Sequence, residues 1–225
     1  MTHLLALALL SVAQGPDGVI EASSKVSFPV RLQPPAVGAT QTLTGTGIRT
    51  RTMLAVKVYA FGLYVDAPAA ATALTSWAGR PARDLERDPS FYGELTKDNF
   101  AKTLRLVMTR NVDGTTMAEA FDNAVGPRVR RAAQELGMPG GEPALATFRG
   151  FFSTSKLTVG SELIFSWLPG GKLVTTIQGK TEGEIASPAL CWALFDVYLG
   201  ADPISPGGKR TVIARFPELL ASAPQ

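Results

Sequence analysis

The stretch that decides the fold runs from Gly45 to Asp66 and reads GTGIRTRTMLAVKVYAFGLYVD. It contains two runs of strand-forming residues joined by a short Met-Leu-Ala link, and the second run is apolar at nearly every position. A strand that is apolar on both faces needs a covering layer on each of them. Charge inside such an element is costly without a partner. We therefore expect Arg49 and Arg51, which lie in the first run, to have a binding partner.

Two tyrosines in the second run, Tyr59 and Tyr64, indicate what that partner is. A guanidinium beside a tyrosine hydroxyl in apolar surroundings suits a carboxylate or an enolate oxygen. The stretch therefore predicts a pocket for a small amphipathic organic anion. The alternative interpretation is that Arg49 and Tyr59 form only a cross-strand packing pair.

The register of the two strands decides which side chains meet. With Leu54 at the centre of the turn, Arg49 lies opposite Tyr59 on one face of the hairpin. The same register places Arg51 opposite Lys57, which is unfavourable unless both side chains reach solvent or an anion. We therefore expect a guanidinium and a phenol to project together toward the layer that covers this face.

The composition is that of a globular protein. Hydrophobic residues make up 45% of the 225 residues and charged residues 18%, and the net charge is +3. This length suits one domain with a full core, which we assign to residues 16–225. The basic residues are spread out except for Arg128, Arg130 and Arg131, which we interpret as a solvated helix face. Because a nucleic-acid surface would need a denser basic patch with interleaved aromatics, we expect no nucleic-acid partner.

Histidine and cysteine are nearly missing from the sequence. The one histidine is His3, in the amino-terminal segment. If that segment is cleaved off as a signal peptide, the remaining chain has no histidine and cannot use a Ser-His-Asp or Cys-His mechanism. It would also lack the commonest metal ligand. The one cysteine, Cys191, lies in an apolar helical pattern and is interpreted as a buried, inert thiol. We therefore expect no metal and no cofactor.

The amino-terminal segment, MTHLLALALLSVAQG, contains a short apolar run and a small-x-small cleavage pattern at Ser11-Val12-Ala13. This pattern is typical of a secretory signal peptide, here residues 1–15, and predicts a periplasmic or secreted protein. The run is shorter than the roughly 20 residues of a membrane span, so no stable span is expected. No Lys or Arg lies near the start, and the alternative is a buried amino-terminal apolar segment.

Periodicity and turn signals predict an α+β fold. Strands are expected over 19–21, 26–32, 45–52, 56–65, 102–111, 162–167 and 172–178. Helices are expected over 67–77, 115–136, 144–152, 187–199 and 205–221, whereas 85–95 reads as irregular. The helix over 115–136 is expected to have a threonine cap and to be kinked or interrupted at Pro127. Since strands outnumber crossovers, we predict a large antiparallel sheet with helices packed on one face. A pocket between those layers would fit this architecture.

The helical patterns after the central strand supply a candidate lining for the pocket. Met117, Phe121, Phe148, Phe151 and Phe152 recur at helical spacing. Such residues are usually plain core, and they become pocket lining only where a cavity exists. The complete set of predicted ligand-binding residues is Arg49, Tyr59, Tyr64, Met117, Phe121, Phe148 and Phe152.

Three segments in the same order resemble the chalcone isomerase superfamily. Gly47-Ile48-Arg49 is similar to its Gly-x-Arg strand, and Lys57 to Tyr64 to its Lys-x-x-Ala-x-Gly-x-Tyr strand. The segment from Ser187 to Ser205 resembles the late helix of the same superfamily, and residues 109–125 its middle part. The resemblance spans about Val26 to Leu220 and implies an open-faced sandwich, a large antiparallel sheet with helices on one face.

The resemblance to the enzymes of this superfamily is incomplete at the site. Those enzymes close a chalcone into a flavanone by intramolecular oxa-Michael addition, and Arg49 matches their arginine, which attracts the phenolate. Their threonine, tyrosine, asparagine and Ser or Thr are replaced here, in that order, by Tyr59, Met117, Ala124 or Asn123, and Leu190 or Ala189. A polyphenol site that has lost its hydrogen-bond partners would bind its substrate poorly.

The departures resemble the bacterial and fatty-acid-binding branch of the superfamily more closely. In that branch an arginine and a tyrosine, matching Arg49 and Tyr59, clamp a carboxylate while the acyl chain lies between sheet and helices. Burial of each methylene contributes about 0.8 kcal/mol, so such a site needs no catalytic group. We therefore expect a non-catalytic fatty-acid-binding protein. An isomerase using Arg49 for oxyanion stabilisation and Tyr59 as proton donor, or a scaffold with a collapsed pocket, are the alternatives.

Overall fold

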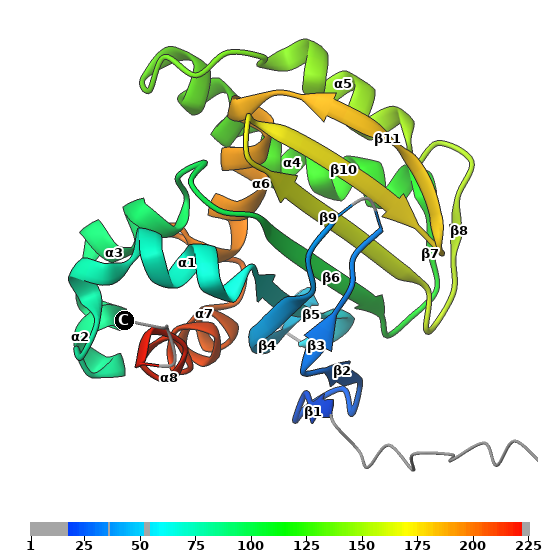
Figure 1. Ribbon diagram of the computed structural model, residues 1–225. Coiled ribbons are helices and arrows are strands. Elements are labelled where there is room, and N and C mark those ends of the chain that lie inside the picture. Colours follow the sequence, from blue (N-terminus) through cyan, green and yellow to red (C-terminus); the bar gives the residue numbers. More distant parts are fainter. Residues whose placement is uncertain (1–17, 36, 52–54, 222–225) are drawn as a thin grey trace, which may run out of the picture.

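The computed structural model describes residues 18–35, 37–51 and 55–221. The predicted signal segment, residues 1–15, and the centre of the turn at Leu54 lie outside them. A curled antiparallel sheet of seven strands forms the middle of the molecule (Figure 1). In spatial order its strands are β11 (Lys180–Ala186), β10 (Lys172–Ile177), β9 (Glu162–Leu168), β6 (Lys102–Met108), β5 (Val56–Val65), β4 (Gln41–Arg51) and β3 (Arg31–Leu32).

Two small ribbons accompany this sheet. β1 (Gly18–Ile20) pairs with β2 (Ser27–Pro29), and β7 (Val112–Asp113) pairs with β8 (Lys156–Leu157). The helices are α1 (Ala67–Ala73), the 3-10 turn η1 (Thr75–Trp77), α2 (Ala82–Arg87), α3 (Pro89–Leu95), α4 (Gly114–Gln134), α5 (Glu142–Gly150), α6 (Pro188–Leu199), α7 (Pro206–Ile213) and α8 (Phe216–Ala221). Together they confirm the predicted α+β fold, with α4, α5 and α6 stacked behind the sheet in Figure 1.

The β4–β5 hairpin has the predicted pairing at its centre. Arg49 lies opposite Tyr59, as expected. The predicted Arg51–Lys57 pair is wrong, because the register shifts between Arg49 and Thr50 and places Thr50 opposite Lys57. A shift of this kind adds one residue to one strand and re-aims the side chains beyond it. Arg51 is thereby released from a like-charge neighbour.

The glycines of β4 let a helix lie directly on the strand. A Cβ built on Gly45 would lie 2.5 Å from the backbone oxygen of Thr211, and one on Gly47 would lie 2.6 Å from the Cα of Gly208. Thr211 and Gly208 both belong to α7. Real Cβ atoms do not approach backbone this closely, so the contact between β4 and α7 depends on both glycines.

The late hairpin and its helix agree with the predicted elements. β9 and β10 pair across the turn at 169–171, and α6 begins after Ser187. The Ser187 hydroxyl accepts a hydrogen bond from the Leu190 backbone amide at 3.1 Å, and the helix ends before Gly200. The edge strand β11 was not predicted, because its sequence KTEGEIA is mostly polar and half exposed.

Helix α4 runs through Pro127 from Gly114 to Gln134, so the proline does not interrupt the helix. A proline removes one backbone donor and crowds the carbonyl of the preceding turn. Here the Arg128 guanidinium donates to the carbonyl of Ala124 at 2.8 Å, within that turn. The predicted threonine cap is also wrong, since the residue at the cap position is Asp113 and the helix begins at Gly114.

Two further predictions about helices need correction. The segment 85–95, predicted to be irregular, forms part of α2 and α3, which bury only Leu85, Phe91 and Leu95 between them. This burial is too sparse to give a periodic signal. Residues 205–221, predicted as one helix, form α7 and α8 with a break between Ile213 and Phe216.

The sheet separates two apolar clusters. The main core lies between the sheet and the helices, where Leu104, Leu163 and Phe165 from the strands meet Phe148 and Leu194 from the helices. A smaller cluster on the opposite face holds Phe28, Leu43, Ala60, Tyr64 and Val107. The main core therefore occupies the same layer in which the pocket was predicted.

Candidate functional site

A cavity of about 740 Å³ lies at one end of the main layer. It is bounded by the ends of β4 and β5, the segment after β6, the first half of α4 and the segment after α6. Its volume is in the ordinary range for small-molecule sites. The residues that line it are Arg49, Arg51, Val58, Tyr59, Arg110, Asn111, Val112, Asp113, Thr116, Met117, Glu119, Ala120, Phe121, Asn123, Ala124, Arg128, Val197, Asp202, Pro203 and Ile204.

Arg49 is a half-buried cation in this cavity. Its Nη1 makes one long contact of 3.5 Å to the backbone carbonyl of Ile204. Within the described residues it has no carboxylate partner, whereas Arg105 is paired with Glu162 and Arg128 with Asp196. An arginine guanidinium has five N–H donors, so most of those on Arg49 are left for a ligand.

Tyr59 lies beside Arg49 and carries a buried hydroxyl. The oxygen atoms of Tyr59 and Tyr198 are 2.9 Å apart, within hydrogen-bond distance. Burial raises the pKa of Tyr59 to about 12, although the bond to Tyr198 and the charge of Arg49 lower it in part. Burial also raises the pKa of Tyr198. Both phenols are therefore neutral near physiological pH and are available as donors.

Tyr198 was not among the predicted site residues. It lies near the end of α6, in which every residue after Pro188 is buried. A tyrosine in so apolar a helix must place its hydroxyl against a polar partner. That requirement was a usable signal in the sequence, but the identity of the partner depends on how α6 packs on β5.

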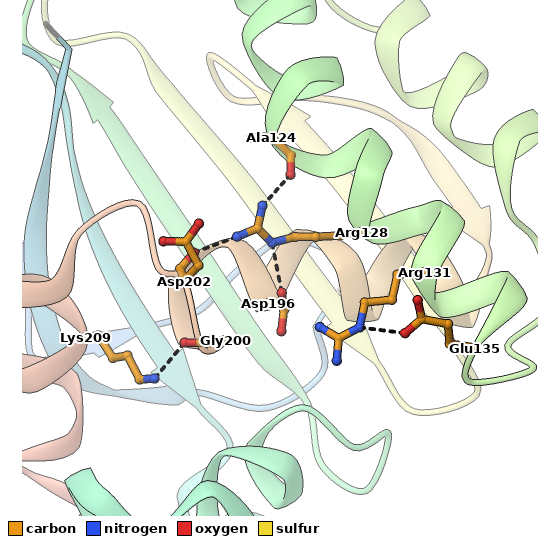
Figure 2. A network of polar contacts seen from close by, with 8 residues as sticks. All are labelled: Ala124, Arg128, Arg131, Glu135, Asp196, Gly200, Asp202 and Lys209. Atoms are coloured by element: carbon orange, nitrogen blue, oxygen red, sulfur yellow. Dashed lines mark hydrogen bonds and ion pairs between the residues drawn. The ribbon is translucent and has the colours of Figure 1, made fainter.

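Arg128 also lines the cavity, but each of its three guanidinium nitrogens already makes a hydrogen bond within the protein (Figure 2). Its Nε bonds to the Asp196 carboxylate at 2.8 Å, Nη1 to the carbonyl of Ala124 at 2.8 Å, and Nη2 to the carbonyl of Asp202 at 2.6 Å. The residue thus fastens α4 to α6 and to the segment after it. The interpretation of Arg128 as part of a solvated face is therefore wrong, whereas Arg130 and Arg131 are exposed.

The predicted lining residues divide into two groups. Met117 and Phe121 line the cavity, on consecutive turns of α4. Phe148 and Phe152 do not, because they pack with Phe121 and Phe165 into a cluster whose ring centroids lie 5.2–6.4 Å apart. These rings fill the space beside the cavity, and Phe121 belongs both to the cluster and to the cavity wall.

Tyr64 lies on the other face of the sheet from Tyr59. It belongs to the small cluster with Phe28 and Leu43, and burial raises its pKa. The prediction that it contributes to the pocket needs correction, because successive strand residues alternate in direction and an interval of five residues reverses the face. The face of Tyr64 could have been derived from its spacing to Tyr59.

The mouth of the cavity carries both signs of charge. Arg51 and Arg110 are exposed there, together with Asp113, Glu119 and Asp202. The half-buried Arg49 therefore differs from the other charged residues in lying next to the buried tyrosine pair. The site therefore consists of a cationic and phenolic region that adjoins the apolar side chains of α4.

The positions aligned with polar enzyme residues are also placed by the structure. Asn123 and Ala124 both line the cavity, while Ala189 and Leu190 are fully buried in α6 and do not. No group of three or more His, Cys, Asp or Glu residues suited to a metal occurs in the described residues. Among those same residues, the helices are all too short or too polar to cross a membrane.

Comparison with known proteins agrees with this fold. Residues 39–213 match the family described as "Chalcone isomerase like", so the chain belongs to the chalcone-isomerase-like family. It is 26% identical over 205 residues to fatty-acid-binding protein 1 of Arabidopsis thaliana, covering 88% of this chain and 70% of the relative. It is 29% identical over 217 residues to chalcone–flavanone isomerase of Oryza sativa, covering 91% and 88%.

A solved structure shares the architecture. The crystal structure of an Arabidopsis thaliana fatty-acid-binding protein superimposes with a TM-score of 0.75 at 25% sequence identity. The match covers 91% of this chain and all of that chain. The family thus includes proteins named as isomerases and proteins named as fatty-acid binders, and similarity alone does not separate the two.

Proposed function

We propose that this chain is a non-catalytic protein that binds a fatty acid or a similar amphipathic carboxylate in the cavity between β4, β5 and α4. The observation that carries the proposal is Arg49, a half-buried guanidinium without a carboxylate partner in the described residues, adjacent to the Tyr59 hydroxyl. A carboxylate offers two oxygen atoms and can accept from both groups. The apolar side chains of Val58, Met117 and Phe121 would contact the start of the acyl chain.

The similarity to proteins named for fatty-acid binding supports this proposal. Tyr59 argues in the same direction, because a phenol whose pKa is about 12 keeps its proton near neutral pH: it can donate a hydrogen bond to a carboxylate, but it is a weak acid for proton transfer. Isomerase activity remains the alternative, favoured by the relatives named chalcone–flavanone isomerase and by Asn123 in the cavity wall. In that case Arg49 would stabilise a developing oxyanion and Tyr59 would donate a proton.

The test is a binding measurement by isothermal titration calorimetry with sodium laurate. Arg49→Ala should weaken laurate binding by at least about tenfold, because it removes a charge-assisted partner of the carboxylate. The matched control is Arg31→Ala, an exposed arginine on β3 outside the cavity, which should bind as the wild type does. Wild-type affinity in Arg49→Ala would contradict the proposal, and turnover of a chalcone that Arg49→Ala abolishes would favour the isomerase instead.

We also propose that the chain is exported to the periplasm or secreted, with residues 1–15 as its signal. The apolar run and the small-x-small pattern at residues 11–13 support this proposal. Expression of the full chain with its first segment intact, followed by intact-mass measurement of the exported protein, tests it. A mass that includes residue 1 would contradict cleavage, and recovery only from the cytoplasm would contradict export.

A further inference from the structure

We propose that Tyr198 is a positioning residue that donates its hydroxyl proton to Tyr59, so that the proton of Tyr59 is directed into the cavity. The site then presents a donor rather than an acceptor to its ligand, and it selects head groups that accept a hydrogen bond. This inference rests on the proposed function, because it names the partner that prepares Tyr59 to hold a carboxylate.

Tyr59 and Tyr198 carry two hydroxyl protons between them. Each phenol hydroxyl can donate one hydrogen bond and can also accept. Only one bond connects Tyr59 and Tyr198, and in the part of the chain that the structure describes neither hydroxyl has another partner. One of the two protons is therefore left without an acceptor inside the described protein.

The positions of the two tyrosines relative to the cavity decide which hydroxyl proton is left without an acceptor. Tyr59 lines the cavity, whereas Tyr198 is not among the described residues that line it and is only 2% exposed. If Tyr59 donated to Tyr198, the remaining proton would belong to Tyr198 and would be buried away from the cavity, which is costly. If Tyr198 donates to Tyr59, the remaining proton faces a space that water or a ligand can occupy. The second arrangement is therefore favoured.

The direction of the bond between Tyr198 and Tyr59 affects which head groups the site can bind. A hydroxyl that already accepts a hydrogen bond is a stronger donor to its next partner, because hydrogen bonds in a chain polarise one another. Arg49 adds donors and positive charge at the same end of the cavity. An ionised carboxylate satisfies both groups, since one oxygen can accept from Tyr59 and the other from Arg49. A head group that offers only N–H donors would leave the Tyr59 proton unpaired.

The packing around Tyr198 makes the proposal testable with a small change. Its ring packs edge-on against Phe61 with centroids 4.8 Å apart. Phenylalanine keeps this ring contact and removes only the hydroxyl. Tyr198→Phe should therefore preserve the fold while it removes the donor to Tyr59, and the melting temperature and circular dichroism spectrum will check that it does.

The experiment measures laurate affinity by isothermal titration calorimetry for the wild type and for Tyr198→Phe, and the sign of the change is decisive. If Tyr198 donates to Tyr59, its loss should weaken laurate binding about threefold or more. If Tyr59 instead donates to Tyr198, that bond must break on binding, and the substitution would tighten binding. Unchanged or tighter binding overturns the inference while leaving the proposed function intact.

A double-substitution cycle separates positioning from a general structural effect. In a Tyr59→Phe background, Tyr198→Phe should change laurate affinity by less than twofold, because the Tyr59 hydroxyl through which Tyr198 acts is already missing. A further loss there would overturn the inference, since Tyr198 would act by another route. Tyr64→Phe, which removes a hydroxyl from the opposite face of β5, is the matched control and should bind as the wild type does. Absence of laurate binding by the wild type would overturn the proposed function and this inference together.

Discussion

The layer between the sheet and the helices contains two cationic side chains, Arg49 and Lys102, in different surroundings. At the open end, Arg49 faces a cavity next to two tyrosine hydroxyls. At the closed end, Lys102 is 1% exposed, and its ammonium lies 4.2 Å from the ring centroid of Phe100 and 4.1 Å from that of Trp167. Burial lowers the pKa of Lys102 to about 7, although Asp98 raises it in part.

Arginine and lysine differ in how well they keep their charge when they are desolvated, which explains why each is found where it is. A guanidinium keeps its charge when it is desolvated, so Arg49 can remain cationic beside the buried tyrosine pair. Burial brings the pKa of Lys102 to about 7, so this lysine loses its proton far more readily than an exposed one; its Nζ donates to the carbonyl of Lys97 at 2.6 Å. The open region is thus suited to recognising charge, and the closed region to burying apolar surface.

The largest expected effect comes from opening the closed region. Phe148→Ala removes a ring that is fully buried against three other phenylalanines. It should lower the free energy of unfolding by about 3–5 kcal/mol, because lost burial adds to the energy of the cavity left behind. Urea unfolding followed by circular dichroism measures this change.

Val159→Ala is the matched control for that measurement. Val159 is an apolar residue that is 65% exposed. Its truncation should change the free energy of unfolding by no more than about 0.5 kcal/mol. Equal effects of the two substitutions would mean that the phenylalanine cluster is not the closed core described above.

The next effect is a pH dependence that arises in the closed region, at Lys102. The pKa of Lys102 is about 7 in the folded state and 10.5 in the unfolded state, so between these values the unfolded chain binds more protons. Stability should therefore rise with pH in this window, by on the order of 1–2 kcal/mol from pH 7 to pH 8.5. Lys102→Met should remove this rise, because methionine does not titrate.

Urea unfolding of both proteins at a series of pH values measures the difference. Arg51→Met serves as the control, since Arg51 is exposed at the cavity mouth and should leave the pH profile unchanged. A wild type whose stability is flat over this range would show that Lys102 remains charged above its aromatic neighbours.

The smallest effect tests the boundary between the two regions. Phe121 belongs both to the cavity wall and to the phenylalanine cluster. Phe121→Leu should extend the cavity toward Phe165 and allow more of a long acyl chain to be buried. Because one buried methylene contributes about 0.8 kcal/mol, the affinity for myristate relative to laurate should rise roughly fourfold for each added methylene that fits.

The ratio of the two affinities, measured by calorimetry, is the readout. Using a ratio removes any general weakening caused by the substitution. Met117→Leu, which changes another wall residue while roughly conserving volume, should leave the ratio near its wild-type value. A shift toward shorter chains in Phe121→Leu would mean that the acyl chain leaves through the mouth instead.

Local patterns were sufficient to predict the main elements and the Arg49–Tyr59 pair. A register counted from a turn centred on Leu54 placed these residues opposite each other, and the late turn and cap residues located β9, β10 and α6. The failures have physical reasons. β11 is a polar edge strand, and the early helices α2 and α3 bury few side chains, so neither has a clear periodicity.

The site itself was only partly predictable because it depends on long-range packing. Tyr198 meets Tyr59 across 139 residues of sequence, and no local pattern encodes that contact. Phe148 and Phe152 have the same spacing and character as wall residues, but the packing of α5 closes them into the core. A helical periodicity identifies a buried face, and only the fold decides whether that face borders a cavity.

The contact between β4 and α7 has a consequence for how this sequence can diverge. Gly47 and Gly208 touch backbone to backbone, although 161 positions separate them in the chain. A side chain at either position would force the helix away from the strand that carries Arg49. Mutational drift is therefore restricted at two distant positions jointly, and a library randomised at both should return mostly paired glycines among its folded members.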